Sequence, residues 1–134
     1  MTSDARHISV TIQRSAEDVY AFVSDPRNLP QWAAGLSGSI ENVNGEWLAD
    51  SPMGKVTVRF APANSFGVLD HYVTLPTGVS FYNPLRVFPN GDGSECVFTL
   101  YRQSAMSDGE MDNDAEMIAA DLQTLKRLME SARA

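Results

Sequence analysis

The sequence has 134 residues, enough for one globular domain and too few for two, so we expect residues 1–134 to form a single domain. Ten basic residues against seventeen acidic ones give a formal net charge of −7, which disfavours binding to nucleic acid and to anionic membranes. With 43% hydrophobic and 20% charged residues, the composition is typical of a soluble globular protein.

The first 36 residues predict one strand followed by two short helices. In Arg6–Gln13 polar and apolar residues alternate, which is typical of a strand with one buried face. Ser15 can cap a helix, because its hydroxyl can accept a backbone N–H of the first turn. Asp25 and Pro26 begin a second short helix, which fades at Gly35. The apolar face of this second helix consists of Leu29, Trp32, Ala33 and Leu36.

From residue 39 to residue 103 the pattern changes to short strands separated by tight turns. The predicted strands are Ser39–Val43, Glu46–Ala49, Lys55–Phe60, Gly67–Leu75, Val79–Phe88 and Ser94–Gln103. Asn44-Gly45 is a strong signal for a two-residue hairpin turn, since both turn positions need positive φ. Connections of about two to six residues are too short for crossover helices, so we expect an antiparallel meander.

A long amphipathic helix is predicted from about Gly109 to Ala132. Its apolar residues recur at alternating steps of four and three and form one continuous stripe. The stripe consists of Met111, Ala115, Ile118, Leu122, Leu125 and Met129. We therefore expect an α+β fold in which a six- to seven-stranded antiparallel sheet wraps around this helix, with the two short helices closing one end. Space would remain wherever the side chains of sheet and helix do not meet.

The chain carries no sign of export or membrane insertion. The longest unbroken apolar run, Val19–Val23, has five residues, far fewer than a membrane-spanning helix needs. Met1–Val10 lacks the apolar core of a signal peptide, and Cys96 has no second cysteine to pair with. A cytoplasmic protein in a reducing compartment is therefore expected.

Five segments, spread over nearly the whole chain, are similar to one known superfamily. They are Ser15–Pro26, Leu29–Trp32, Val68–His71, Leu85–Glu95 and Asp121–Lys126. The sequence thus resembles the START-like superfamily, also called SRPBCC or helix-grip, and in particular its small bacterial, polyketide cyclase-like members. The resemblance implies the helix-grip fold. It implies much less about chemistry, because members bind lipids, sterols or polyketides, some cyclise or dehydrate, and some serve protein partners.

The more apolar side of each strand selects the side chains that would face a cavity between sheet and helix. Two polar residues, His71 and Asn83, fall on this side, and burying either without a partner costs about 1–3 kcal/mol. His71 is either a hydrogen-bonded core histidine or a group that orients or protonates a ligand. The candidate ligand-binding residues are Trp32, Val58, Phe60, His71, Phe81, Asn83, Phe98, Ile118 and Leu122, and His71 is also the candidate catalytic residue.

Several other polar groups are weaker candidates. Arg102 could direct a cation into the cavity, whereas Asp70 points to the opposite face from His71, which argues against a His–Asp dyad. Tyr82, Tyr101 and Arg86 fall on the outer side, where we expect cross-strand surface pairs. Two histidines and one cysteine argue against a zinc site, and the acidic run 108–116 lacks the glycine and glutamate of a calcium loop. We expect no metal and no cofactor.

Three functions are compatible with these residues. The first is binding of a lipid-, aromatic- or polyketide-like hydrophobic small molecule. The second is a cyclase or dehydratase that uses His71 as acid or base, and the third is a protein-interaction module with a filled core. The edge strands of a meander would also allow a homodimer, but no sequence feature decides the oligomeric state.

Overall fold

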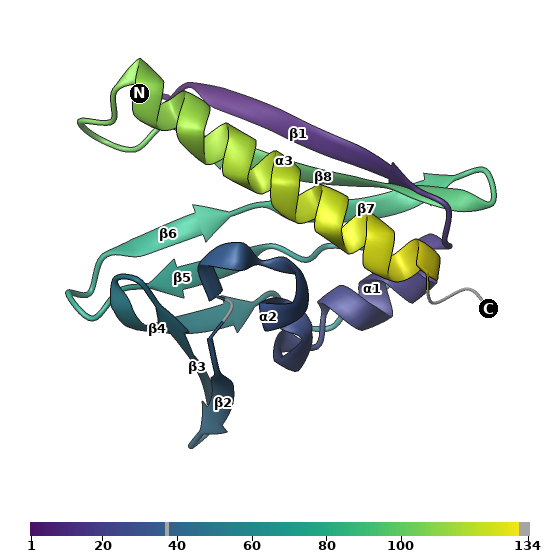
Figure 1. Cartoon of the computed structure of the whole chain (residues 1–134), viewed down its shortest axis with the longest axis horizontal. Coiled ribbons are helices and arrows are strands. Elements are labelled where there is room, and N and C mark those ends of the chain that lie inside the picture. The colour runs from purple at the N-terminus through teal and green to yellow at the C-terminus, as the bar shows by residue number, and fades with distance from the viewer. Residues whose placement is uncertain (37, 132–134) are drawn as a thin grey trace.

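Two antiparallel sheets and a long C-terminal helix make up the fold in the computed structural model, which describes residues 1–36 and 38–131 (Figure 1). The strands are β1 (Ala5–Ile12), β2 (Ile40–Val43), β3 (Glu46–Ser51), β4 (Gly54–Phe60), β5 (His71–Thr74), β6 (Ser80–Asn83), β7 (Leu85–Asn90) and β8 (Gly93–Tyr101). The α-helices are α1 (Ala16–Val23), α2 (Leu29–Trp32) and α3 (Asp108–Ser131), and the single-turn 3-10 helices are η1 (Pro26–Asn28) and η2 (Ala34–Leu36). The predicted α+β architecture, with a sheet around a C-terminal helix, is confirmed.

The two sheets meet where the chain passes through Pro84. Strands β1, β8 and β7 form one sheet in that order, and β2 to β6 form the other in chain order. The predicted strand Val79–Phe88 is therefore two strands, β6 in one sheet and β7 in the other. Pro84 explains the break because it has no N–H for a β-ladder, while its carbonyl oxygen accepts the N–H of Thr99 at 3.0 Å.

The predicted strand Gly67–Leu75 is also shorter in the structure, where only its second half forms β5. The first half pairs with β7 instead: the Leu69 N–H donates to Leu85 O at 2.8 Å, and the Val87 N–H donates to Gly67 O at 3.0 Å. Gly67 has φ +73°, which ends regular strand geometry at that residue. These bonds hold the two sheets together beside Pro84.

The predicted caps and turns are confirmed, with one difference in the short helices. The Asp18 N–H donates to Ser15 Oγ at 3.1 Å, and Asn44 and Gly45 have φ values of 54° and 88°. The second predicted helix is divided into η1, α2 and η2. At the other end of the chain α3 is described as far as Ser131, so its predicted end at Ala132 lies outside the described residues.

Helix α3 lies along β1 and also contacts β8 and α2 (Figure 1). Segment η2 contacts β3, so the short helices link α3 to the five-stranded sheet. The apolar stripe of α3 is buried near both ends, at Met111 and from Leu122 onward, but Ala115 and Ile118 in its middle are only half-buried. The middle of α3 is therefore less completely covered than its ends.

Candidate ligand-binding site

The five-stranded sheet has one apolar face, which we call the inner face. Strand register places Phe60 opposite His71, and His71 opposite Asn83, in one row across β4, β5 and β6. A second row on the same face contains Val58, Val73 and Phe81. Side chains alternate along a strand, so the parity predicted from the sequence for these strands is confirmed. Phe60, Val73, Phe81 and Asn83 are only half-buried, however, although they share this face with the core.

His71 is the buried polar group of this face, with 6% of its surface exposed. Its Nδ1 lies 3.0 Å from the carbonyl oxygen of Leu69, and its ring contacts those of Phe60 and Phe98, with centroid distances of 4.9 and 6.3 Å. Burial lowers the pKa of His71, since the charged imidazolium is poorly solvated there. Nε2 has no hydrogen-bond partner among the residues that the structure describes. His71 is thus a neutral imidazole whose Nε2 can still form a hydrogen bond.

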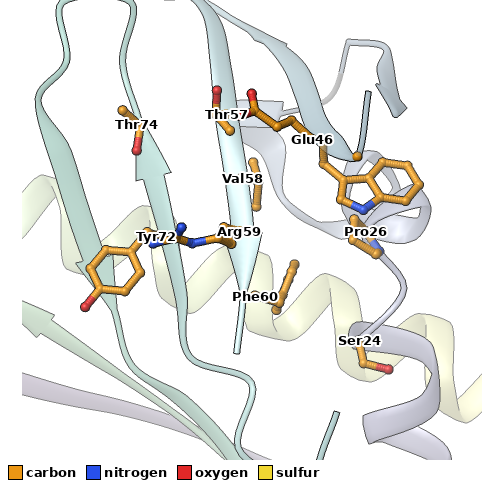
Figure 2. A pocket seen from close by; sticks show the side chains of 11 residues that line it. Ser24, Pro26, Glu46, Thr57, Val58, Arg59, Phe60, Tyr72 and Thr74 are labelled. Atoms are coloured by element: carbon orange, nitrogen blue, oxygen red, sulfur yellow. The ribbon is translucent and has the colours of Figure 1, made fainter. Parts of the chain in front are cut away.

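An open groove of about 520 Å³ lies beside the inner face, at the edge of β4. The pairing of β3 with β4 ends at Trp47 opposite Val58, so the last two residues of β4 have a strand partner only in β5. The groove runs around this free edge: Val58 and Phe60 line it from the inner face, and Thr57, Arg59, Tyr72 and Thr74 line it from the outer face. Figure 2 shows Val58 and Phe60 on the side of β4 that faces Pro26, with Arg59 and Tyr72 on the other side.

The position of this groove differs from the predicted cavity between sheet and C-terminal helix. No residue of α3 lines the groove, whereas Ser24 and Pro26, at the end of α1 and the start of η1, form part of its wall. Two predicted ligand-binding residues, Val58 and Phe60, line it. The groove and the His71 region are adjacent, because the Phe60 ring lines the former and contacts the latter.

The other predicted site residues are divided between the inner face and the core. Phe81 and Asn83 lie on the inner face next to His71 and Val73. Phe98 and Leu122 are buried core residues, and Ile118 is half-buried in the middle of α3. These residues come from three separate parts of the chain.

Trp32, on α2, is also buried, with 6% of its surface exposed. Its indole Nε1–H has no hydrogen-bond partner within the described ranges. The structure therefore places Trp32 in the core, and its link to a ligand stays a prediction.

Sequence reasoning missed a half-buried carboxylate on α3, that of Asp121. Its Oδ1 accepts the N–H of Ala34 at 3.1 Å, which ties η2 to α3. Burial raises the pKa of Asp121, although this hydrogen bond lowers it. Its position next to the apolar stripe residue Leu122 was a usable signal, because a carboxylate beside such a stripe needs a partner.

On the outer face a polar and aromatic network forms instead. The Tyr72 and Tyr82 rings stack at 5.1 Å, and Tyr82 Oη donates to Asp70 at 2.9 Å. Arg86 donates twice to Asp70, at 2.7 and 3.0 Å. Burial by itself raises the pKa of Asp70, but the Arg86 guanidinium and the Leu85 N–H outweigh it and hold that pKa below its usual value. The expected surface pairs are confirmed, and Asp70 has no direct hydrogen bond to His71.

Arg102 does not supply a cation to the inner face, contrary to one sequence-based alternative. Its guanidinium donates to Asp108 at 2.7 Å, to Met106 O at 2.9 Å and to Asp4 at 3.2 Å. The nearby acidic side chains hold it at the junction between β8 and α3. Met106 and Asp108 follow Arg102 by four and six residues, and Asp4 lies near the N-terminus, so the alternating pattern of β8 by itself did not reveal these partners.

Cys96 is fully buried, and burial raises the pKa of its thiol to about 12, as expected for an inert side chain. In residues 1–36 and 38–131, no three His, Cys, Asp or Glu side chains come close enough to hold a metal ion. None of the helices in these ranges is both long and apolar enough to cross a membrane.

Comparison with known proteins gives a family match and many similar structures. The sequence matches the model of the family described as "Polyketide cyclase / dehydrase and lipid transport" over residues 7–130. A search of curated proteins found no match.

Among solved structures, a conserved protein from Geobacillus kaustophilus is similar with a TM-score of 0.74 and 13% identity, over 96% of this chain and 97% of that one. The Aha1 dimer from Colwellia psychrerythraea is similar with a TM-score of 0.73 and 14% identity, over 98% and 99%. DynU16, a protein in the dynemicin biosynthetic locus, has a TM-score of 0.73 and 13% identity, and the matched region covers 96% of this chain but 48% of DynU16. At these identities the likeness shows the helix-grip fold alone.

Proposed function

The chain belongs to the family described as polyketide cyclase/dehydrase and lipid transport, and from this premise we propose that it binds a hydrophobic small molecule. The site would be the inner face of the five-stranded sheet around His71, reached through the groove beside Phe60. Ile118 in the middle of α3 would contribute from the helix side.

Incomplete burial of the inner face is the observation that carries this proposal. Phe60, Val73 and Phe81 are half-buried, whereas Val56 and Val58 on the same face have 1% of their surface exposed. Removing apolar surface from water contributes about 25 cal/mol per Å². A ligand that covers the exposed parts of these side chains would therefore be bound more tightly. The adjacent groove, which Phe60 lines but His71, Val73, Phe81 and Asn83 do not, has a volume of about 520 Å³, within the size range of small-molecule sites.

A neutral fluorescent dye tests the proposal directly. We expect N-phenyl-1-naphthylamine to bind saturably to the native protein and Phe81→Lys to weaken this binding by about tenfold, because the substitution places a charge on the apolar face. Phe88→Lys is the matched control, since Phe88 lies on β7 and is 47% exposed. Native mass spectrometry of freshly purified protein would then identify any retained ligand. Absence of saturable binding, or equal losses in both variants, would overturn the proposal.

A cyclase or dehydratase is the second candidate function, and two observations favour it. The family description names both reactions, and His71 offers an unpartnered Nε2 within an apolar surface. One positioned histidine contributes about 10²- to 10⁴-fold as a general acid or base. This candidate would require turnover of a polyketide-like substrate that His71→Phe abolishes while dye binding persists.

A further inference from the structure

We propose that His71 and Asn83 make the inner face selective for neutral, hydroxylated apolar molecules over carboxylates, an inference that rests on the ligand site proposed above. The two residues are direct cross-strand partners on β5 and β6. Cβ atoms of such partners lie about 4.5–5.5 Å apart. One polar group of a ligand can therefore meet both side chains, while the rest of the ligand contacts apolar neighbours such as Phe60 and Phe81.

The proton on His71 determines what its free nitrogen can bind. The carbonyl oxygen of Leu69 can only accept a hydrogen bond, so Nδ1 carries the proton in this contact. In the neutral ring Nε2 is then an acceptor and needs a donor from the ligand. The neutral form is the favoured one, because burial lowers the pKa of His71. A hydroxyl group satisfies this requirement, whereas an ionised carboxylate has no proton to donate.

Asn83 complements this acceptor. Its side chain is half-buried, and its amide makes no hydrogen bond to any other described residue. The amide NH₂ can donate to the same hydroxyl oxygen that donates to His71. A ligand hydroxyl would thus be bound both as donor and as acceptor.

Arg59 lies over the Tyr72 ring at 5.9 Å and lines the groove, but on the opposite side of β4 from Phe60 (Figure 2). None of the described Lys and Arg side chains lies on the inner face around His71, so none balances an anion there. Their contacts are Arg6–Asp112, Arg14–Asp18, Arg27–Asp25, Lys55–Asp50, Arg59–Tyr72, Arg86–Asp70, Arg102–Asp108, Lys126–Glu130 and Arg127–Thr124. None of these contacts involves a side chain of the inner face around His71. Burying a carboxylate without a cation is strongly unfavourable, so the site should reject acids that share the same apolar body.

Three naphthalene derivatives of similar size separate the effect of hydrogen-bond donation from the effect of negative charge at pH 7.5. 2-Naphthol is neutral and donates a hydrogen bond, 2-methoxynaphthalene cannot donate, and 2-naphthoate is ionised. We expect 2-naphthol to bind about fivefold more tightly than 2-methoxynaphthalene, as one net hydrogen bond implies, and 2-naphthoate to bind most weakly. Displacement of N-phenyl-1-naphthylamine measures all three affinities.

Two variants test how His71 and Asn83 each contribute to the binding of these compounds. His71→Phe should reduce the affinity for 2-naphthol to that for 2-methoxynaphthalene and change the latter less than twofold. Asn83→Leu, on a half-buried position, should weaken the binding of 2-naphthol and of 2-methoxynaphthalene by a similar factor, because the oxygen of either compound can accept from the amide, and it is the second variant if His71→Phe does not fold. Tyr101→Phe, 37% exposed on the outer face, is the control and should leave all three affinities unchanged.

The outcomes distinguish this inference from the proposed function. Equal affinities for the alcohol and the ether, or tightest binding of 2-naphthoate, would overturn the selectivity and leave hydrophobic binding intact. Failure of all three compounds and of the dye to bind would overturn the proposed function itself.

Discussion

Two neighbouring residues, Asp70 and His71, have opposite environments because successive side chains point to opposite faces. Asp70 accepts hydrogen bonds from Arg86, Tyr82 and the Leu85 N–H on the outer side. His71 is enclosed by aromatic rings on the inner side. The alternation was readable from the sequence, but the partners of Asp70 were not, because they lie 12 to 16 residues away on other strands.

Asp70→Asn should lower the free energy of unfolding at pH 7 by about 1–2 kcal/mol, because it weakens the charged hydrogen bonds of a carboxyl group that is 13% exposed, although its partner Arg86 is 52% exposed. The pKa of Asp70 is lowered in the folded protein, so its contribution is present above pH 4 and is lost as pH falls further. Urea titrations at pH 7 and pH 3.5 measure both effects.

Asp50→Asn provides the comparison, because the Asp50–Lys55 pair is exposed and should contribute little. A loss for Asp70→Asn that is no larger than for Asp50→Asn, or that is unchanged at pH 3.5, would contradict this account.

At the scale of elements, caps and turns follow from local sequence, whereas strand lengths depend on partners. The Ser15 cap and the Asn44-Gly45 turn form as predicted, because their bonds and dihedral angles involve only nearby residues. Strands Gly67–Leu75 and Val79–Phe88 are shorter than predicted or divided, because each changes its partner strand part-way. Pro84 signalled one of these changes, since it cannot donate to a ladder.

Gly67→Ala should destabilise the junction between the sheets much more than Gly78→Ala. Both glycines have positive φ, of 73° and 93°, so each substitution carries a backbone cost of about 1–2 kcal/mol. A Cβ on Gly67 would in addition lie 1.9 Å from Val87 O, whereas one on Gly78 would meet nothing within 4 Å. Thermal or urea unfolding of the two variants measures the difference, and equal losses would show that the close contact with β7 is unimportant.

For the whole molecule, stability is linked to the protonation of the buried His71. Its pKa is lowered in the folded state, so the unfolded chain binds a proton more readily. The stabilisation is complete above the unfolded value of about 6.5 and is lost as pH falls below it. The free energy of unfolding therefore depends on solution pH through this buried side chain.

The native protein should therefore lose unfolding free energy between pH 7.5 and pH 5.5 through His71, by no more than the ~1.4 kcal/mol that one proton taken up on unfolding allows over this interval. His71→Phe should show a smaller loss over the same interval, because the groups that titrate elsewhere are common to both proteins. Urea titrations at four pH values would reveal this difference. Parallel profiles would mean that His71 is protonated equally easily in the folded and unfolded states.

The sequence by itself determined the class of fold, the order of its elements and the polar residues of the inner face. Hydrophobic period, caps and turn residues are local properties, so His71 and Asn83 could be placed on that face without coordinates. Only the tertiary structure decided which apolar side chains stay half-buried, where the groove lies and which group each arginine contacts. These depend on where strand pairing ends and on how α3 lies against the sheets, and both are set by contacts between residues far apart in the chain.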